Sequence, residues 1–209
     1  PITKTLFADP VARETDPALW PALAEGALAL LDQPGAGTLE ALLEEFEPFH
    51  AAVARAESAL LCEGRGNIDS DAALWTCSHL LHDLPRLAQG DSHLPLPLGL
   101  LARHQLTRAA LGEATPARAA LVRDFLDALE REIHGALGVA AAHTLRQRVR
   151  VRLDLALIRA ARKAADPLVF LATNGQAGYW RSLWTGWREA RGLAENRADT
   201  GPTAGRRRP

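Results

Sequence analysis

The chain of 209 residues contains no methionine, one tyrosine, two cysteines and only two lysines, Lys4 and Lys163. Two cysteines are too few for a disulfide framework or a cysteine-based zinc site, so we expect Cys62 and Cys77 to be free thiols in apolar helical surroundings. No segment approaches the ~20 apolar residues that a membrane-spanning helix needs. The start of the chain also lacks a basic leader. We therefore expect a soluble, cytoplasmic protein.

The sequence also lacks the short motifs of several large enzyme classes. It contains no phosphate-binding P-loop, no dinucleotide-binding glycine fingerprint, no G-x-S-x-G nucleophile elbow and no C-x-x-C pair. β-branched residues are scarce, because Ile and Val together number eleven, whereas Ala and Leu dominate an apolar content of 47%. This composition is typical of packed helices and argues against an extensive sheet.

Apolar periodicity and helix start signals predict a single all-α, bundle-like domain of about seven to eight helices over residues 1–195. The arginine-rich end of the chain, residues 196–209, is predicted to be a disordered basic tail. A helix begins after Thr38 in this prediction, and Pro48 is expected to kink or split it. Another helix is expected from about 98 to 111.

The segment 148–155, "RVRVRLDL", alternates polar and apolar residues as a strand does. The strongly helical residues after it, and the lack of a matching second strand, favour a helix instead. We expect the apolar segment 168–172 to be a short buried turn or strand.

Charge is unevenly distributed along the chain. Residues 1–100 carry 5 basic and 15 acidic side chains, whereas residues 101–209 carry 19 and 10. The two halves either offset each other within the fold or leave a basic surface for an acidic partner. As a helix, 146–163 directs its arginines to many sides, so it lacks the single basic face typical of nucleic-acid binding. We therefore do not expect nucleic acid to be a partner.

The stretch "WTCSHLLHDLPR" contains the most chemically suggestive group of side chains. On a helix, His79 and Asp83 are neighbours at positions i and i+4, where both can reach one metal ion. Alternatively, Asp83 can orient His79 as a general base. A third interpretation follows from Pro85, which disfavours helix at the residue before it. A new helix would then begin at Leu84, with Asp83 as its N-cap.

A catalytic zinc ion usually needs three protein ligands. His104 lies in the next predicted helix, which could pack antiparallel to the first. We therefore predict a divalent metal site, zinc being the example, formed by His79, Asp83 and His104. The metal would activate water in a hydrolase.

The segments "SHLLHDLPRLA" and "LLARHQLTRAAL" together resemble a helical bacterial family of unknown function whose members carry a His-x-x-x-Asp-Leu helix. The resemblance covers residues 70–112 and matches at His79, Asp83, Leu84 and His104. It implies an all-helical fold and no known activity. Zinc-dependent phospholipases C and P1-type nucleases show a more distant resemblance, since they also use His-x-x-x-Asp pairs as ligands.

The predicted last helix carries three tryptophans, Trp180, Trp184 and Trp187, at positions i, i+4 and i+7 on one face. Arg181 and Arg188 lie close to them. Aromatic residues at this spacing either dock a helix onto the core or form an exposed surface for a protein partner, where Trp and Arg are enriched. Our leading hypothesis is an interaction or regulatory module that binds a partner through this helix, and the alternative is the metal-dependent hydrolase.

Overall fold

The computed structural model describes residues 16–31, 35–60, 68–89, 95–139, 144–174 and 179–199. Within these ranges the chain forms eight α-helices, two 3-10 helices and no strand, which confirms the all-α prediction. The α-helices are α3 (Leu19–Leu31), α4 (Leu39–Leu60), α5 (Ile68–Asp83), α6 (Leu98–Arg103), α7 (Pro116–Val139), α8 (Leu145–Lys163), α9 (Pro167–Asn174) and α10 (Tyr179–Asp199). The 3-10 helices are η1 (Leu84–Gln89) and η2 (Arg108–Gly112).

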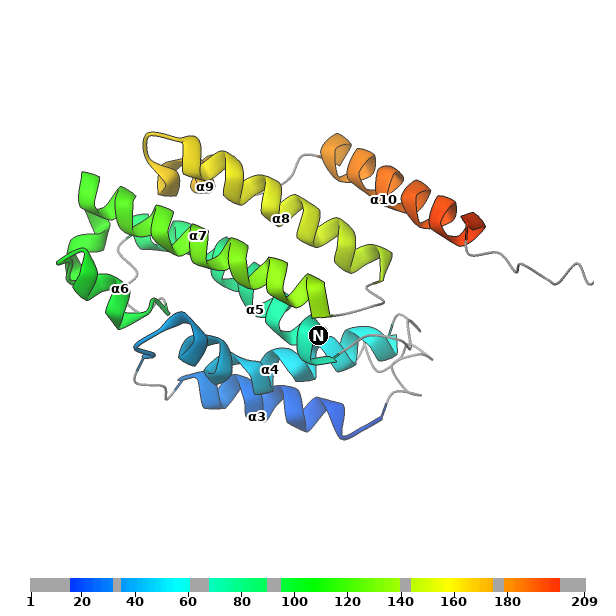
Figure 1. Cartoon of the computed structure of the whole chain (residues 1–209). Helices are drawn as coiled ribbons and strands as arrows, with labels where there is room; N and C mark the ends of the chain where they lie inside the picture. The colour runs from blue at the N-terminus through cyan, green and yellow to red at the C-terminus, as the bar shows by residue number, and fades with distance from the viewer. Residues whose placement is uncertain are drawn as a thin grey trace, which may run out of the picture.

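Helix α5 lies at the centre of the bundle (Figure 1). It packs against α4, α7 and α8, while α3 covers the outer side of α4. Helix α10 packs on α8 at the opposite side of the molecule from α3. No helix in the described ranges is both long and apolar enough to cross a membrane.

The core forms where α5, η1, α7 and α8 meet. Its fully buried side chains include Leu81, Leu84, Phe125, Leu129 and Ile158. Leucine and alanine at three- and four-residue steps place one apolar face of each helix toward this centre, and burial of that face supplies most of a helix's stability in a protein.

Helix α4 begins as predicted, because the Thr38 hydroxyl accepts the backbone N–H of Ala41 at 3.2 Å. The helix runs unbroken through Pro48, so the predicted split does not occur. The helix expected over 98–111 is instead interrupted between α6 and η2. Gln105 adopts a positive φ of 53° there, and Thr107 caps η2 by accepting the N–H of Ala110.

The segment 148–155 is helical, as predicted, and lies within α8. A capping box formed by Thr144 and Gln147 begins the helix. The alternating arginines then fall into two i, i+4 pairs on different sides of the helix. Each pair holds one glutamate: Arg146 and Arg150 contact Glu57 at 2.9 and 3.0 Å, and Arg148 and Arg152 contact Glu189 at 3.1 and 3.0 Å.

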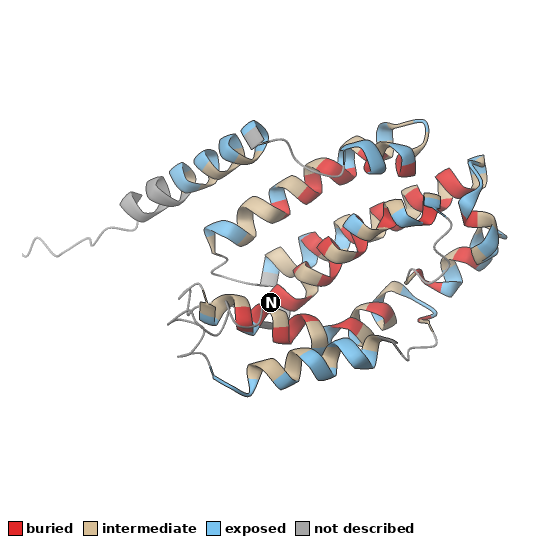
Figure 2. Cartoon of the chain, turned by 180° about the vertical axis from the view of Figure 1, so that it is seen from behind, coloured by how far each residue is buried: buried red, intermediate tan, exposed pale blue. Residues whose placement is uncertain are grey.

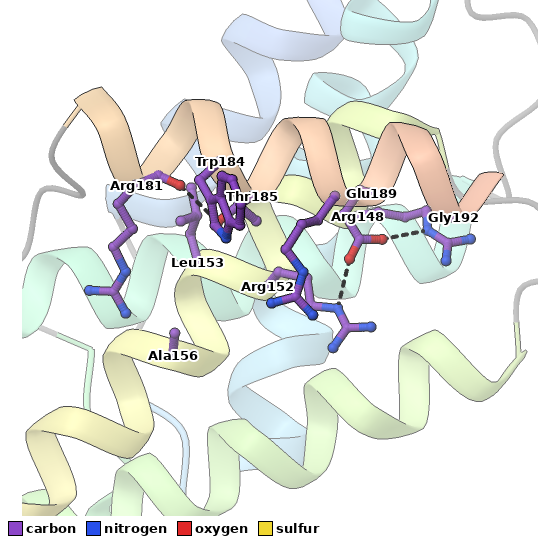
Figure 3. A pocket seen from close by; sticks show the side chains of 10 residues that line it. Arg148, Arg152, Leu153, Ala156, Arg181, Trp184, Thr185, Glu189 and Gly192 are labelled. Atoms are coloured by element: carbon purple, nitrogen blue, oxygen red, sulfur yellow. Dashed lines mark hydrogen bonds and ion pairs between the residues drawn. The ribbon is translucent and has the colours of Figure 1, made fainter. Parts of the chain in front are cut away.

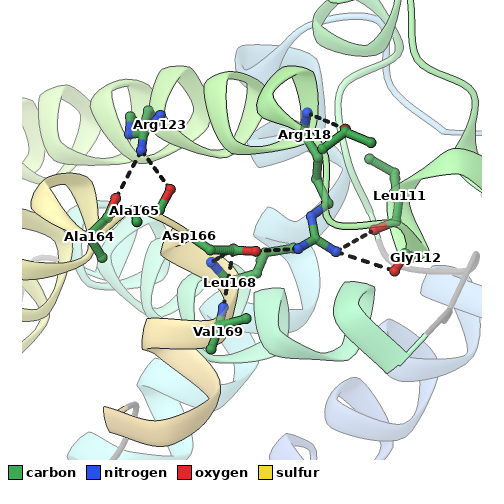
Figure 4. A network of polar contacts seen from close by, with 10 residues as sticks. Leu111, Gly112, Arg118, Arg123, Ala164, Ala165, Asp166, Leu168 and Val169 are labelled. Atoms are coloured by element: carbon green, nitrogen blue, oxygen red, sulfur yellow. Dashed lines mark hydrogen bonds and ion pairs between the residues drawn. The ribbon is translucent and has the colours of Figure 1, made fainter.

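The segment 168–172 belongs to helix α9 rather than to a strand or turn. Asp166 caps this helix by accepting the N–H groups of Leu168 and Val169. The same carboxylate pairs with Arg118, which is only 2% exposed and also donates to the carbonyls of Leu111 and Gly112 (Figure 4). One buried guanidinium thus ties η2, α7 and α9 together.

Helix α10 continues to Asp199, so its last four residues occupy the start of the segment predicted as a disordered tail. The rest of that tail, together with Cys62, lies outside the described residues.

Candidate functional site

The tryptophans of α10 are exposed rather than docked onto the core. Trp180, Trp184 and Trp187 are 79%, 61% and 52% exposed, and Leu183 beside them is 46% exposed. Figure 2 shows that α10, like α3, carries no buried residue among those described, in contrast to α4, α5, α7, α8 and α9. The alternative in which this face packs against the core is therefore wrong.

The opposite face of α10 holds the helix against α8. Glu189 follows Trp180 by nine residues, which is roughly two and a half helical turns, so the two side chains point to opposite sides. Glu189 accepts contacts from Arg148 and Arg152, and a Cβ added at Gly186 would lie 3.9 Å from the side chain of Val149. Helix α10 thus attaches through polar and small residues and turns its apolar face outward.

A groove of about 440 Å³ runs between α8 and α10. Figure 3 shows Glu189 across from its two arginines, with Arg181 and Trp184 farther along the same groove. Arg181 and Arg188 line it and have no ion-pair partner within the described part of the chain. Its lining includes four arginines (Arg148, Arg152, Arg181 and Arg188) and one glutamate, so the groove has an excess of positive charge.

In the stretch that contains His79, α5 ends at Asp83 and the chain continues into η1. The predicted i, i+4 pair forms, because His79 Nε2 lies 2.9 Å from Asp83 Oδ2. Arg86 lies 3.5 Å from the same oxygen. The helix break expected from Pro85 is therefore present, because η1 begins at Leu84, yet the Asp83 carboxylate contacts side chains of its own segment, as in the interpretations in which His79 and Asp83 are neighbours.

The structure adds a residue that the sequence analysis missed, His50 of α4. Its Nε2 atom lies 3.1 Å from His79 Nδ1, and its Nδ1 atom lies 2.9 Å from the hydroxyl of Thr76. His50 is 2% exposed, and burial together with the neighbouring His79 lowers its pKa to about 4, although a backbone hydrogen bond at Phe46 opposes the shift. His50 is therefore neutral near pH 7.

The chain of hydrogen bonds from Asp83 to Thr76 has two consistent proton arrangements. When the Thr76 hydroxyl donates to the carbonyl of Ala72, at 2.9 Å, it must accept from His50 Nδ1, so His50 Nε2 accepts from His79. His79 then carries protons on both nitrogens, because a carboxylate can only accept. When Thr76 donates to His50 instead, His50 Nε2 donates to His79 Nδ1, and His79 keeps only the Nε2 proton that it donates to Asp83.

His104, the third predicted metal ligand, ends α6 and makes a different contact. Its Nε2 atom lies 3.0 Å from Asp124 Oδ2 on α7. Within the described ranges, no three His, Cys, Asp or Glu side chains are grouped so that they could hold a metal ion. The structure thus brings His79 and Asp83 together and places His104 in a separate pair.

His82 makes a second long-range pair beside the first. Its Nε2 atom lies 3.0 Å from Oδ1 of Asp154, a residue of α8 that is 4% exposed. The hydrogen bond to Asp154 raises the pKa of His82 against the opposing effect of burial, and the charges of Asp154 and Asp83 raise it further.

The basic residues of α8 are largely paired within the protein. Besides the two pairs that hold Glu57 and Glu189, Arg159 and Arg162 contact Glu130 of α7. Of these partners, only Glu57 belongs to the acidic half of the chain. The two halves therefore offset each other in part, and much of the charge of α8 is neutralised within the basic half.

Comparison of the chain with models of protein families, with curated proteins and with solved structures gave no match. The resemblance to a bacterial family over residues 70–112 stays a prediction.

Proposed function

We propose that this protein is an interaction module that binds a partner protein through the exposed tryptophan face of α10. The observation that carries the proposal is the orientation of this helix, which holds α8 with Glu189 and turns Trp180, Trp184 and Trp187 toward solvent. Large apolar surfaces that are rimmed by polar residues mark interaction sites. Tryptophan and arginine are the residues most enriched among those that dominate binding energy.

The chemistry of the neighbouring groove indicates the kind of partner. Trp184 and Trp187 lie with ring centroids 5.0 Å apart, so they form one continuous aromatic surface. Arg181 and Arg188 are next to it. A partner segment with an apolar anchor and adjacent carboxylates complements both features. Nucleic acid fits less well, because most arginines of α8 already have carboxylate partners.

The proposal is tested by replacing Trp184 with a photo-crosslinking phenylalanine analogue in cells that produce the protein. Leu28 of α3, which is 63% exposed, is the matched control position. We expect a crosslinked complex of defined mass from position 184 that is lost when Trp180 and Trp187 are changed to Ala. Equal crosslinking from both positions, or none from 184, would contradict the proposal.

A metal-dependent hydrolase is the second candidate function. The hydrogen bond between His79 and Asp83 favours it, since it brings two of the predicted ligands together. Both ring nitrogens of His79 are engaged, so a metal ion would have to replace its bond to Asp83 or to His50 and would need further ligands. Metal analysis of protein purified without an affinity tag tests this function. Stoichiometric zinc that is lost in His79→Ala would support it, and a stable, metal-free protein would remove it.

A further inference from the structure

The groove between α8 and α10 has a charge imbalance that its own residues do not resolve. It is lined by four arginines and one glutamate, an excess of three positive charges, within a volume of about 440 Å³. The glutamate, Glu189, already contacts Arg148 and Arg152 at 3.1 and 3.0 Å. Like charges that are held together repel one another unless an anion lies between them. The groove therefore favours an anionic ligand.

The donors that remain for such a ligand come from both walls of the groove. Arg181 and Arg188 of α10 have no ion-pair partner within the described ranges. They are seven residues apart, about two helical turns or roughly 10 Å, so both lie on the same side of the helix. On the α8 wall, Arg148 and Arg152 approach Glu189 through Nε, and their terminal Nη atoms make no hydrogen bond to a described residue. An anion in the groove can therefore accept hydrogen bonds from two helices.

The number of charges and donors favours a phosphate monoester over other biological anions. Near pH 7 this group carries a charge of about −1.5 to −2 and has three acceptor oxygens, which point to different sides. It can therefore neutralise Arg181 and Arg188 together, and planar guanidinium groups bind phosphate oxygens in a forked manner. A single carboxylate carries one charge on two oxygens in one plane, so it leaves positive charge unpaired. The phosphodiesters of nucleic acid likewise carry only one charge per phosphate.

The rest of the lining matches an organic group attached to that phosphate. Leu153 and Ala156 of α8 and Trp184 of α10 add apolar surface to the groove (Figure 3). Trp184 is 61% exposed, so its indole ring is accessible to a ligand. A free phosphate ion would contact the arginines and leave this apolar surface uncovered. The groove thus combines a cationic part with an apolar part, and an organic phosphate contacts both.

We propose that the groove between α8 and α10 binds a phosphate monoester with an apolar body. Arg181, Arg188 and the Nη atoms of the α8 arginines hold the phosphate, and Trp184 packs against the body. The phosphate belongs either to a phosphorylated side chain of a partner protein or to a free small molecule. Trp180 and Trp187 do not line the groove, so this site can be tested separately from the proposed partner surface.

The test uses isothermal titration calorimetry and NMR of the full-length protein at constant ionic strength, because salt screens exposed charges. The ligands are phenyl phosphate, its monoanionic methyl ester, phenylacetate and inorganic phosphate. We expect phenyl phosphate to bind ~10-fold more tightly than each of the other three, as the loss of one charged hydrogen bond or of the apolar contact implies. It should shift the Trp184 indole signal and, since it contacts both helices, slow amide exchange in α10.

Variants assign the binding to the groove. Arg181→Gln and Arg188→Gln should each weaken the binding of phenyl phosphate by ~10-fold. Neither arginine has an ion-pair partner in the described part of the chain, so folding is not at risk. Arg131→Gln is the matched control, because Arg131 is exposed on α7, outside the groove, and also lacks an ion-pair partner there. This control and a double variant with Trp180→Ala and Trp187→Ala should bind phenyl phosphate as the wild type does.

A phosphopeptide with leucines on both sides of phosphoserine distinguishes the two sources of the phosphate. If it binds more tightly than N-acetyl-phosphoserine amide, and the tryptophan double variant loses this gain, the phosphate belongs to a partner protein. Equal binding of the two assigns it to a free small molecule. The proposal is overturned if phenyl phosphate does not bind, or binds no more tightly than its methyl ester, phenylacetate or inorganic phosphate. Unchanged affinity in both Arg181→Gln and Arg188→Gln would also overturn it.

Discussion

His50 Nε2 and His79 Nδ1 lie 3.1 Å apart and share one hydrogen bond between a buried ring and a half-exposed ring. Only one of the two facing nitrogens can carry the proton between them. The protonation of His79 therefore decides which nitrogen of His50 carries its proton, and through His50 the orientation of the Thr76 hydroxyl. A proton that His79 gains near the surface therefore changes the hydrogen bonding of Thr76, which is only 1% exposed.

Burial of His50 predicts a loss of stability in acid. Its pKa is about 4 in the folded protein and about 6.5 in the unfolded chain. The unfolded chain binds more protons between these values, so the free energy of unfolding falls by up to ~3 kcal/mol as the pH drops from 6.5 to 4. Urea unfolding of wild type and His50→Gln across this range measures the effect, and the difference between the two proteins should shrink toward pH 4. A constant difference would contradict the prediction.

His82 provides the opposite control, because its pKa is raised in the folded protein. Its contribution is fully present below the unfolded pKa of about 6.5 and is lost as the pH rises through the folded value. The stability difference between wild type and His82→Gln should therefore shrink toward high pH rather than toward low pH.

The buried guanidinium of Arg118 predicts a large mutational effect. Arg118→Met leaves the Asp166 carboxylate without its cation and the carbonyls of Leu111 and Gly112 without their donor. Removing one partner of a buried ion pair costs about 3–5 kcal/mol. Chemical denaturation measures this loss. Arg181→Met, at an exposed site without an ion-pair partner among the described residues, should change stability by less than about 0.5 kcal/mol.

Two glycines predict opposite effects of the same substitution. A Cβ at Gly26 of α3 would lie 2.8 Å from the backbone Cα of Phe49, so Gly26→Ala must push α3 and α4 apart at a cost of about 1–3 kcal/mol. A Cβ at Gly135 of α7 would meet nothing within 4 Å. Gly135→Ala should therefore stabilise the protein by ~0.5–1 kcal/mol through helix propensity. Thermal unfolding of both variants tests the pair, and shifts of the same sign would contradict it.

Cys77 is predicted to be unreactive in the folded protein. Burial raises the pKa of its thiol, and the carboxylates of Glu132 and Asp154 raise it further, so the reactive thiolate is suppressed. In a Cys62→Ser background, a thiol-specific reagent at pH 8 should react only as fast as the protein opens. Complete reaction within seconds under native conditions would refute this prediction, and denaturant should restore rapid labelling.

Local patterns in the sequence were sufficient to predict the fold class and the positions of most helices. The predicted start after Thr38 is correct because a capping residue acts within one turn. The predicted helix over 98–111 was wrong because Gln105 adopts a positive φ, a conformation that its sequence does not signal. The segment 168–172 was misread because a short apolar run fits a strand and a buried helix equally well.

The contacts of the candidate sites were harder to predict because they join distant parts of the chain. His50 and His79 are separated by 29 residues, and His82 and Asp154 by 72. One signal for His50 was present: it follows Phe46 by four residues and so falls within the apolar stripe of α4, where a histidine must find internal partners. Asp154 gave the same signal in α8, since Val151 and Ile158 lie on the same stretch of buried surface.

The two arginine pairs of α8 attach it to α4 and to α10, and the two attachments differ in their sensitivity to salt. Glu57 is held within the bundle, beside Trp75, whereas Glu189 fastens a helix that contributes no described buried side chain. The two glutamates are equally buried, but the arginines that hold Glu189 are 36% and 64% exposed, whereas Arg150 beside Glu57 is 18% exposed. Ion pairs with exposed members weaken as the Debye length shortens, so rising ionic strength loosens α10 before it affects the bundle. Its amide protons should accordingly exchange first, in a local opening that leaves the global unfolding transition intact.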